Sequence, residues 1–510
     1  MKNSHKTTAG LVLAVLLLAA SGAGSQTDAD TPAPVTAFEW NSSTPEQQGV
    51  DSAMLLRSIR RIREESLDVR SLIIIRNDHV ILELYVHPYT RDTVHNVKSV
   101  SKSILSALVG IALREEVLEG TNQTVREFFP DYFPEEAADS RNKITLLNLL
   151  TMTSGLDLDE NGPKMQAVFA SDDWIRTTFE ADMAAEPGER FVYSTPLTHT
   201  MVGILTEASG KSVLELATEH LFGPLEFGAL QWTRGPKGYY FGGAELFLRT
   251  CDMAKFGLLY LHGGDWGGAQ VVPAEWVIES TQNRLPDGAS DLYGYWWWID
   301  PDGGGFKAHG WGGQGITVRK DLRMVAAGTA GNPTAGDRMF RDFDPAMISD
   351  EPLPPNPDAV AAIEAFAHEL ENPTPGDVPP LPEIASEVSG KTYRMDDNPR
   401  NLEEFTFRFE PTSRTATVAS MIEGEAFESE IGLDGVYRLN EMGENGPMPQ
   451  SNMLALRGRW TAEDELTVDS HPVGDPIHST WTIKFTLEKL HVEVEVHPIG
   501  QRFTLTGLAK

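Results

Sequence analysis

The segment HNVKSVSKSILSAL, residues 95–108, places serines and lysines at the start of an apolar run. Ser99 and Lys102 are three residues apart, so on a helix they lie on one face. A serine hydroxyl becomes a nucleophile when a nearby base takes its proton, and a lysine of lowered pKa is such a base. The alternative is a serine that caps a solvated helix start. Ser101 is the weaker nucleophile, because the residue three positions later is Ile104.

A second candidate is Tyr193, which follows the Pro-Gly turn of EPGERFVYSTP. A tyrosine held near a lysine ammonium can act as a phenolate base or as a proton relay. Taken alone, the pattern favours a core tyrosine whose hydroxyl is satisfied.

A third candidate is the glycine-rich stretch FKAHGWGGQGITV, residues 306–318. A strand with so many glycines allows close approach of another backbone. Its N–H groups could complete an oxyanion hole with the N–H of Ser99, and His309 could donate a proton or contact substrate. A β-bulge or edge strand with an incidental histidine is the alternative.

The elements that must position these residues follow an α+β order. An Asp-Ser cap and helical spacing predict a helix over residues 51–65, and Asn77-Asp78 predicts a hairpin within 71–86. The expectation is a helical block inserted into an antiparallel sheet. The remaining predicted helices cover 100–112, 143–156 (ending at Gly155), 202–210 and 211–222, and the remaining predicted strands cover 293–300, 305–321 and 323–331.

The composition changes after residue 345. Residues 346–385 are rich in proline and predict a semi-rigid linker with a short helix at 358–371. From residue 386 to 510, short runs alternate apolar and polar residues, as in EFTFRFE. This pattern predicts a separate all-β domain, a small barrel.

Charge and cysteine content exclude several kinds of function. The formal net charge of −32 disfavours nucleic acid and anionic lipid as partners. Cys251 is the single cysteine, so the sequence excludes an intramolecular disulfide and a Cys-rich metal site. No phosphate-binding loop is found. We therefore expect no cofactor and no metal.

The N-terminus has the features of a secretory signal peptide. Lys2 and Lys6 precede the apolar stretch of residues 9–20, which small residues follow. We expect a cleaved signal over residues 1–25, a flexible leader over 26–45, and a periplasmic or secreted protein without stable membrane insertion. An uncleaved anchor is the alternative. The oligomeric state stays open.

The order of the three motifs resembles the beta-lactamase-related serine hydrolases. These include class C beta-lactamases, secreted D-alanyl-D-alanine carboxypeptidases, 6-aminohexanoate-dimer hydrolase and family VIII esterases. The resemblance covers roughly residues 40–345 and places the hydrolase domain at 46–345. It implies an antiparallel sheet flanked by helices, with a helical subdomain opposite. The strands of residues 386–510 are similar to the lipocalin-like barrel that some members carry.

The resemblance also implies roles for the candidate residues. Ser99 would be the acylated nucleophile, Lys102 its base, and Tyr193 the group that shares the proton transfers and protonates the leaving group. The glycine strand would take the place of the family's Lys-Thr-Gly strand, with a backbone amide near Trp311 in the oxyanion hole. The residues of that strand are His309, Gly310, Trp311 and Gly312.

Three departures from the family pattern bear on the substrate. Thr195 stands where Y-x-N has asparagine, and His309 stands where the third motif has lysine, although Lys307 shares its face on a regular strand. Trp311 suggests an apolar pocket. We therefore expect a serine hydrolase that cleaves small-molecule or peptide-like esters or amides without a free carboxylate. The alternatives are a peptidoglycan-related D,D-carboxypeptidase or D-aminopeptidase, a weak beta-lactamase, and a non-catalytic binding protein.

Overall fold

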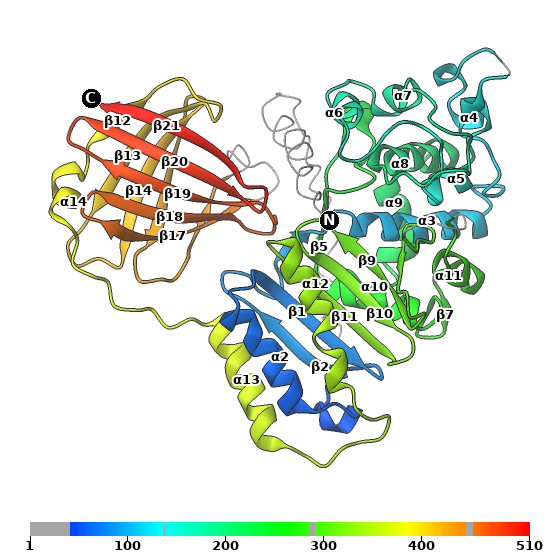
Figure 1. The fold of residues 1–510 in the computed structure, drawn as a ribbon, viewed down its shortest axis with the longest axis horizontal. Coiled ribbons are helices and arrows are strands. Elements are labelled where there is room, and N and C mark those ends of the chain that lie inside the picture. The colour runs from blue at the N-terminus through cyan, green and yellow to red at the C-terminus, as the bar shows by residue number, and fades with distance from the viewer. Residues whose placement is uncertain (1–40, 137, 286–290, 444–451) are drawn as a thin grey trace, which may run out of the picture. The chain divides into compact units, whose positions relative to one another are not determined.

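A computed structural model describes residues 41–136, 138–285, 291–443 and 452–510 (Figure 1). The predicted signal peptide and residues 26–40 of the predicted leader lie outside the described residues. At the other end of that leader, Ser42 forms a parallel bridge with Val80. Within the described ranges, no helix combines the length and the apolar character needed to cross a membrane.

The sheet that supports the candidate site has six antiparallel strands in the order β2-β1-β11-β10-β9-β8. The predicted hairpin around Asn77-Asp78 is confirmed, because both residues have the positive φ (49° and 64°) that a tight two-residue turn needs. The strands are β1 (Val69–Arg76), β2 (His79–Tyr85), β8 (Trp298–Ile299), β9 (Gly305–Gly310), β10 (Gln314–Arg319) and β11 (Met324–Ala330).

Two predicted strands differ from the structure. Residues 305–321 do not form one strand but a hairpin of β9 and β10, because Gly312 and Gly313 have φ of 86° and 94° and turn the chain. Only Trp298–Ile299 of the predicted strand at 293–300 pairs with β9. The predicted strand at 323–331 is confirmed as β11.

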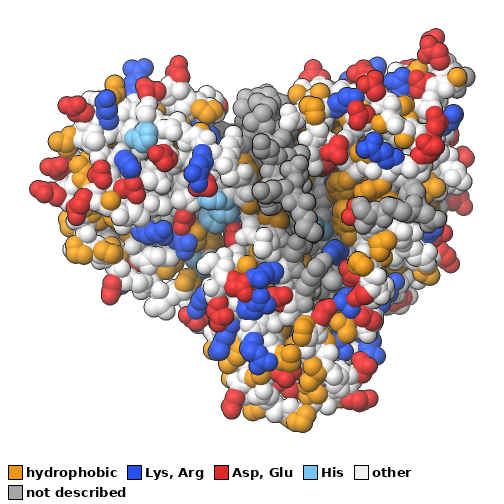
Figure 2. All heavy atoms as spheres, viewed as in Figure 1, with side chains coloured by type: hydrophobic (Ala, Val, Ile, Leu, Met, Phe, Trp, Pro, Cys, Tyr) orange, Lys and Arg blue, Asp and Glu red, His pale blue; other side chains and the backbone are white. Residues whose placement is uncertain are grey.

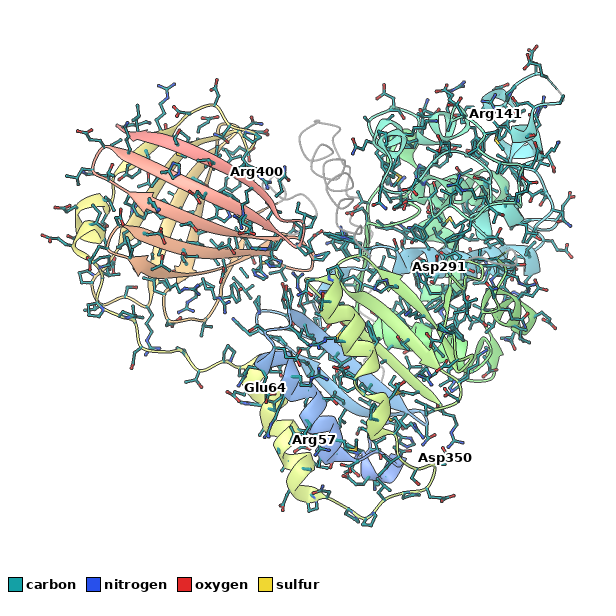
Figure 3. The ribbon with its side chains drawn as sticks, in the orientation of Figure 1. Arg57, Glu64, Arg141, Asp291, Asp350 and Arg400 are labelled. Atoms are coloured by element: carbon teal, nitrogen blue, oxygen red, sulfur yellow. The ribbon has the colours of Figure 1, made fainter. Side chains whose placement is uncertain are left out.

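Helices from the start and from the later part of the hydrolase sequence accompany the sheet. In α2 (Ser52–Glu64), the side chain of Asp51 accepts a hydrogen bond from the N–H of Met54, as the predicted cap requires. Arg57 and Glu64, labelled in Figure 3, lie on the exposed side of this helix. α10 (Thr250–Leu261), which contains the buried Cys251, packs against β10 and β11.

The helical block between β3 (Val94–Asn96) and β8 contains most of the remaining helices. The predicted helix at 143–156 is too long: only α5 (Leu146–Leu150) is helical, because Met152 has a φ of 55° and ends the run. The predicted helix at 202–210 begins earlier, at Thr195, where Pro196 suits the first helical turn. The block comprises α3 (Val100–Arg114), α4 (Val125–Phe128), α5, α6 (Pro163–Phe169), α7 (Trp174–Phe179), α8 (Thr195–Ser209), α9 (Val213–Ala217) and α11 (Ala274–Ser280).

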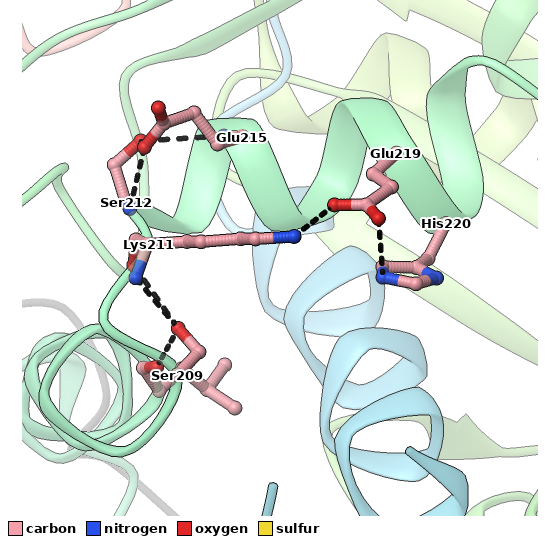
Figure 4. Close-up of polar contacts among 7 residues, drawn as sticks. Ser209, Lys211, Ser212, Glu215, Glu219 and His220 are labelled. Atoms are coloured by element: carbon pink, nitrogen blue, oxygen red, sulfur yellow. Dashed lines mark hydrogen bonds and ion pairs between the residues drawn. The ribbon is translucent and has the colours of Figure 1, made fainter.

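The boundary between the predicted helices at 202–210 and 211–222 is confirmed. Gly210 ends α8 with a φ of 66°, and Ser212 begins α9 with a capping box, since its hydroxyl and Glu215 satisfy each other's backbone N–H groups (Figure 4). Lys211 pairs with Glu219 across the exposed side of this turn. The second helix continues as a π-helical turn over Thr218–Phe222.

The described chain divides into two compact units. The first contains residues up to 83, 94–330 and 334–361, and the second contains 84–93, 331–333 and 362–510. The loop at 84–93 therefore belongs to the second unit although it lies between two strands of the first. There Tyr89 Oη contacts His471 Nδ1 at 3.3 Å, and the N–H of His87 donates to the carbonyl of Leu370 at 2.9 Å.

The second unit contains a ten-stranded antiparallel sheet that closes into a barrel, since Gly432 of β15 pairs in parallel with Arg457 of β17. Phe405, Phe407 and Phe409 alternate with polar residues and are buried, as the predicted barrel requires. The strands are β12 (Thr392–Met395), β13 (Leu402–Phe409), β14 (Thr415–Ile422), β15 (Glu425–Gly432), β16 (Arg438–Glu441), β17 (Met453–Ala462), β18 (Glu465–Pro472), β19 (His478–Phe485), β20 (Lys489–His497) and β21 (Gln501–Ala509).

Three helices accompany the join between hydrolase and barrel sequences: α12 (Pro333–Arg341), α13 (Pro357–Glu371) and α14 (Glu383–Val388). α13 agrees with the short helix predicted at 358–371. Acidic side chains are spread over the visible face with lysines and arginines between them (Figure 2), as the net charge of −32 leads one to expect.

Candidate active site

Ser99 lies where β3 (Val94–Asn96) passes into α3. A small sheet in the order β3-β5-β4, in which β4 is Gln231–Trp232, supports this segment, because the N–H of Val97 donates to the carbonyl of Leu246 in β5 (Leu246–Arg249) at 2.9 Å. Lys98 then has a φ of 49°, and Ser99 takes the N-cap position of α3. Its side chain makes no capping hydrogen bond. The hydroxyl of Ser99 therefore does not cap the start of α3.

Ser101 has a structural role instead. It is buried, and its hydroxyl donates to the carbonyl of Lys98 at 2.8 Å. This bond satisfies a carbonyl at the strained residue before Ser99. The two serines of the motif thus differ in their surroundings, with the hydroxyl of Ser101 committed to the backbone.

The Lys102 ammonium group is buried and surrounded by oxygen atoms. Nζ lies 2.9 Å from Ser99 Oγ, 3.0 Å from Thr195 Oγ1 and 3.0 Å from the carbonyl oxygen of Gly243. Burial lowers the pKa of Lys102 to about 8, although the negative charge of Glu160 opposes this shift. The neutral amine is therefore more populated near neutral pH than in an exposed lysine, and it lies within hydrogen-bond reach of a serine hydroxyl.

Tyr193 lies beside this pair. The ring centroid is 5.0 Å from Lys102 Nζ, and the ring stacks on Trp298 at 5.8 Å. Burial and the negative charge of Glu160 raise the pKa of Tyr193, while a hydrogen bond with Ser99 opposes that rise. The phenol therefore stays protonated at neutral pH, which suits a proton donor better than a phenolate base. The structure brings Ser99, Lys102 and Tyr193 together.

The glycine-rich strand runs directly behind the segment that leads to Ser99. A Cβ atom on Gly310 would lie 2.3 Å from the carbonyl oxygen of Val97 and 3.3 Å from Cβ of Lys98. Only glycine permits this approach of the two backbones. His309 and Lys307 are the partly exposed residues of β9 and alternate with buried ones, so they share a face. Trp311 and Gly312 form the turn to β10, and their predicted oxyanion role stays a prediction.

Sequence reasoning missed Glu160. Its Oε2 accepts a hydrogen bond from the N–H of Thr195 at 2.7 Å, and its Oε1 accepts one from the Thr195 hydroxyl at 2.6 Å. Pro196 signals a helix start at this point, but nothing in the local pattern DLDENG indicates that its glutamate reaches that start. In the sequence, Thr195 differs from the family motif, but its contact with Glu160 is not predicted.

Sequence reasoning also missed the partner of Lys98. The Lys98 ammonium lies 3.1 Å from Glu245 Oε1, which also accepts a hydrogen bond from Asn96 Nδ2 at 3.0 Å. The side chains of Lys98 and Glu245 are only 9% and 7% exposed. This buried ion pair connects Lys98, which precedes Ser99, with Glu245, which precedes β5.

An aromatic group borders the Tyr193 side of the site. Tyr293 packs edge-on against Trp298 at 4.8 Å and lies 5.4 Å from Phe191. Within the ranges that the structure describes, no group of three or more His, Cys, Asp or Glu residues is arranged to hold a metal ion. The chemistry available at the site is therefore that of a serine hydroxyl, an amine and a phenol beside an apolar wall.

Residues 67–341, which contain all of these groups, match the family described as Beta-lactamase. The 6-aminohexanoate-dimer hydrolase of Paenarthrobacter ureafaciens is 24% identical over 321 residues, which are 57% of this chain and 79% of that protein. A solved structure from Bacillus anthracis, described as a candidate 6-aminohexanoate-dimer hydrolase, has a TM-score of 0.51 at 19% identity and covers 68% of this chain and 90% of that one. EstCE1, a hydrolase with promiscuous acyltransferase activity, has a TM-score of 0.50 at 16% identity over 60% of this chain and 99% of its own. At these identities, the two structures show a shared fold.

Proposed function

Because the chain belongs to the beta-lactamase family of serine hydrolases, we propose that it cleaves an ester or amide through an acyl-enzyme formed on Ser99. The observation that carries the proposal is the 2.9 Å contact between Lys102 Nζ and Ser99 Oγ. The lowered pKa of Lys102 supports a role as base, and the Ser99 hydroxyl, which makes no capping hydrogen bond, is placed to act as nucleophile.

In the proposed reaction, neutral Lys102 takes the proton of Ser99 as Oγ bonds to the substrate carbonyl carbon. The backbone N–H of Ser99 and an N–H near Trp311 would stabilise the resulting oxyanion. When the intermediate collapses, Tyr193 gives its proton to the departing alcohol or amine and regains one from the Lys102 ammonium. Water then attacks the acyl group by the same route, which releases the acid and restores the Ser99 hydroxyl.

The surroundings favour substrates with apolar groups near the reacting carbonyl. The rings of Tyr193, Trp298 and Tyr293 offer apolar surface. Thr195 stands in place of the motif's asparagine, and His309 stands in place of the third motif's lysine. We therefore propose esters or amides without a free carboxylate as the substrate class. A panel of such esters, D-peptides and a chromogenic beta-lactam would rank this class against peptidase and beta-lactamase activity.

The test is covalent labelling with a fluorophosphonate probe. Attack of Ser99 Oγ on phosphorus expels fluoride and leaves a phosphonyl group, which intact-protein mass spectrometry detects. We expect one added group on the wild-type protein and on Ser101→Ala, and none on Ser99→Ala. Ser101→Ala is the matched control, because it removes a hydroxyl from the same helical turn.

Two results would contradict the proposal. Labelling that persists in Ser99→Ala would assign the nucleophile elsewhere. A wild-type protein that neither reacts with the probe nor hydrolyses any member of the ester and amide panel would point to a binding role on the same fold.

Gly310→Ala is expected to slow the labelling of Ser99 by about 10²-fold, because the new Cβ must displace the Val97 carbonyl and with it the nucleophile. The rate of probe incorporation measures this effect. Gly120→Ala is the control, since a Cβ at Gly120 has no atom within 4 Å. Equal rates for both variants would mean that the approach of β9 does not position Ser99.

A further inference from the structure

Glu160 has no part in the proposed proton transfers, but only Thr195 separates it from Lys102 in the chain of hydrogen bonds. It follows Asp159, whose side chain accepts the N–H of Asn161 at 2.8 Å in a tight turn between α5 and α6. The N–H of Glu160 donates to the carbonyl of Tyr193 at 3.2 Å. The turn therefore anchors Glu160 to the backbone of a residue in the candidate active site.

Both carboxylate oxygens of Glu160 are engaged by Thr195. The contact with the Thr195 N–H is a common helix-start interaction and needs no catalytic explanation. The contact with the Thr195 hydroxyl is different, because the hydroxyl oxygen of Thr195 also accepts a hydrogen bond from Lys102 Nζ. A hydroxyl that donates to a carboxylate is a better acceptor, since linked hydrogen bonds polarise one another. The side chains form one continuous chain from Ser99 through Lys102 and Thr195 to Glu160.

We propose that Glu160 is a positioning residue that acts through Thr195 to orient the amine of Lys102 toward Ser99. This inference rests on the proposed function, because it assigns the control of the same base. Thr195 Oγ1 and the Gly243 carbonyl fix two directions around Nζ and leave the third toward Ser99 Oγ. The asparagine position of the family motif thus serves here as the link between a carboxylate and the base.

The direction of the electrostatic effect follows from the charges. Glu160 favours the charged ammonium form of Lys102, so it opposes the effect of burial on the pKa of Lys102. Removal of the carboxylate charge lowers that pKa further, and more of the amine is neutral at a given pH. The acidic limb of the activity profile should therefore move to lower pH, while the maximal rate falls because the amine is less well oriented.

The experiment measures the rate constant of fluorophosphonate labelling of Ser99 against pH, using the full chain. Glu160→Gln should shift the acidic limb to lower pH and reduce the maximal rate by about tenfold. Thr195→Val, which keeps the shape but removes the hydroxyl, should reduce the rate by a similar factor. Thr195→Ser restores the hydroxyl and should return the rate to near the wild-type value.

Asp157→Asn is the matched control. It removes one negative charge from the same loop, but Asp157 pairs with Lys164 at 2.8 Å and does not contact Thr195. It should leave the pH profile unchanged. A Glu160→Gln profile equal to wild type, or a Thr195→Val rate equal to wild type, would overturn the inference. So would a shift of equal size in Asp157→Asn, since it would reveal a general charge effect.

The two levels of proposal fail in different ways. If the wild-type protein is not labelled at Ser99, the proposed function fails. If it is labelled and the profile does not respond to Glu160 or Thr195, only the positioning role fails. The Thr195 pair keeps the inference testable should Glu160→Gln not fold, because Thr195→Val removes the hydroxyl that carries the link and Thr195→Ser keeps it.

Discussion

Replacement of Lys102 by methionine is expected to reduce the rate of Ser99 labelling by about 10⁴-fold. Methionine has a similar length and no basic group, so the Ser99 hydroxyl loses the amine that lies 2.9 Å away. Thr195 and Gly243 lose a donor, but the apolar stem of the side chain is preserved. The measurement is the initial rate of probe incorporation, with thermal unfolding as a check that the variant is folded.

The pH dependence of the wild-type protein gives the same prediction a second test. The active form is the neutral amine, so the labelling rate should rise with pH and level off above the Lys102 pKa of about 8. Lys102→Arg is the control for charge, because a guanidinium stays protonated and cannot act as the base. If Lys102→Arg keeps the wild-type rate, Lys102 supplies only a positive charge, and the proposed proton transfer is wrong.

The second large effect concerns stability. Glu245→Ala is expected to lower the free energy of unfolding by about 3 kcal/mol, because it removes the carboxylate 3.1 Å from the buried Lys98 ammonium. Asn96 Nδ2 loses its acceptor in the same variant. The measurement is the urea transition that coincides with the loss of Ser99 labelling, which assigns it to the hydrolase unit.

The control for this prediction is an ion pair of similar composition on the surface. Glu219 pairs with Lys211 in solvent near the start of α9 (Figure 4), and Glu219→Ala should leave the transition almost unchanged. Equal losses for the two variants would show that burial of the Lys98–Glu245 pair contributes nothing. The double variant Lys98→Met/Glu245→Ala should recover part of the loss, since no buried charge is left unpaired.

Local patterns in the sequence predicted those parts of the fold and of the site that depend on local geometry. The spacing of Ser99 and Lys102 is a property of one helical turn, and the hairpin at Asn77-Asp78 is a property of two residues. In the same way, the alternation of Phe405 and its neighbours predicted the barrel strands. In each case, the residues that make the structure are close in the sequence.

The contacts that the sequence did not reveal join distant segments. Lys102 and Thr195 are 93 residues apart, and Lys98 and Glu245 are 147 residues apart. The order of the family motifs places Thr195 near Lys102 but does not predict their hydrogen bond, and no periodicity or motif connects Lys98 with Glu245, because packing of whole elements brings such residues together. The error at 143–156 has a related cause: the apolar run continues through Met152, but the left-handed backbone there ends the helix and directs the chain toward the site.

The assignment of residues 84–93 to the second unit has a consequence for how the chain can be divided. The chain passes between its two units after residues 83, 93, 330, 333 and 361, so no single cut separates them. A gene fusion that merely appended a barrel would leave one passage. Here a loop between two strands of the hydrolase supplies Tyr89 to the barrel unit, where it is buried and contacts His471. A truncation after residue 361 would therefore remove His471 and leave Tyr89 behind without this contact.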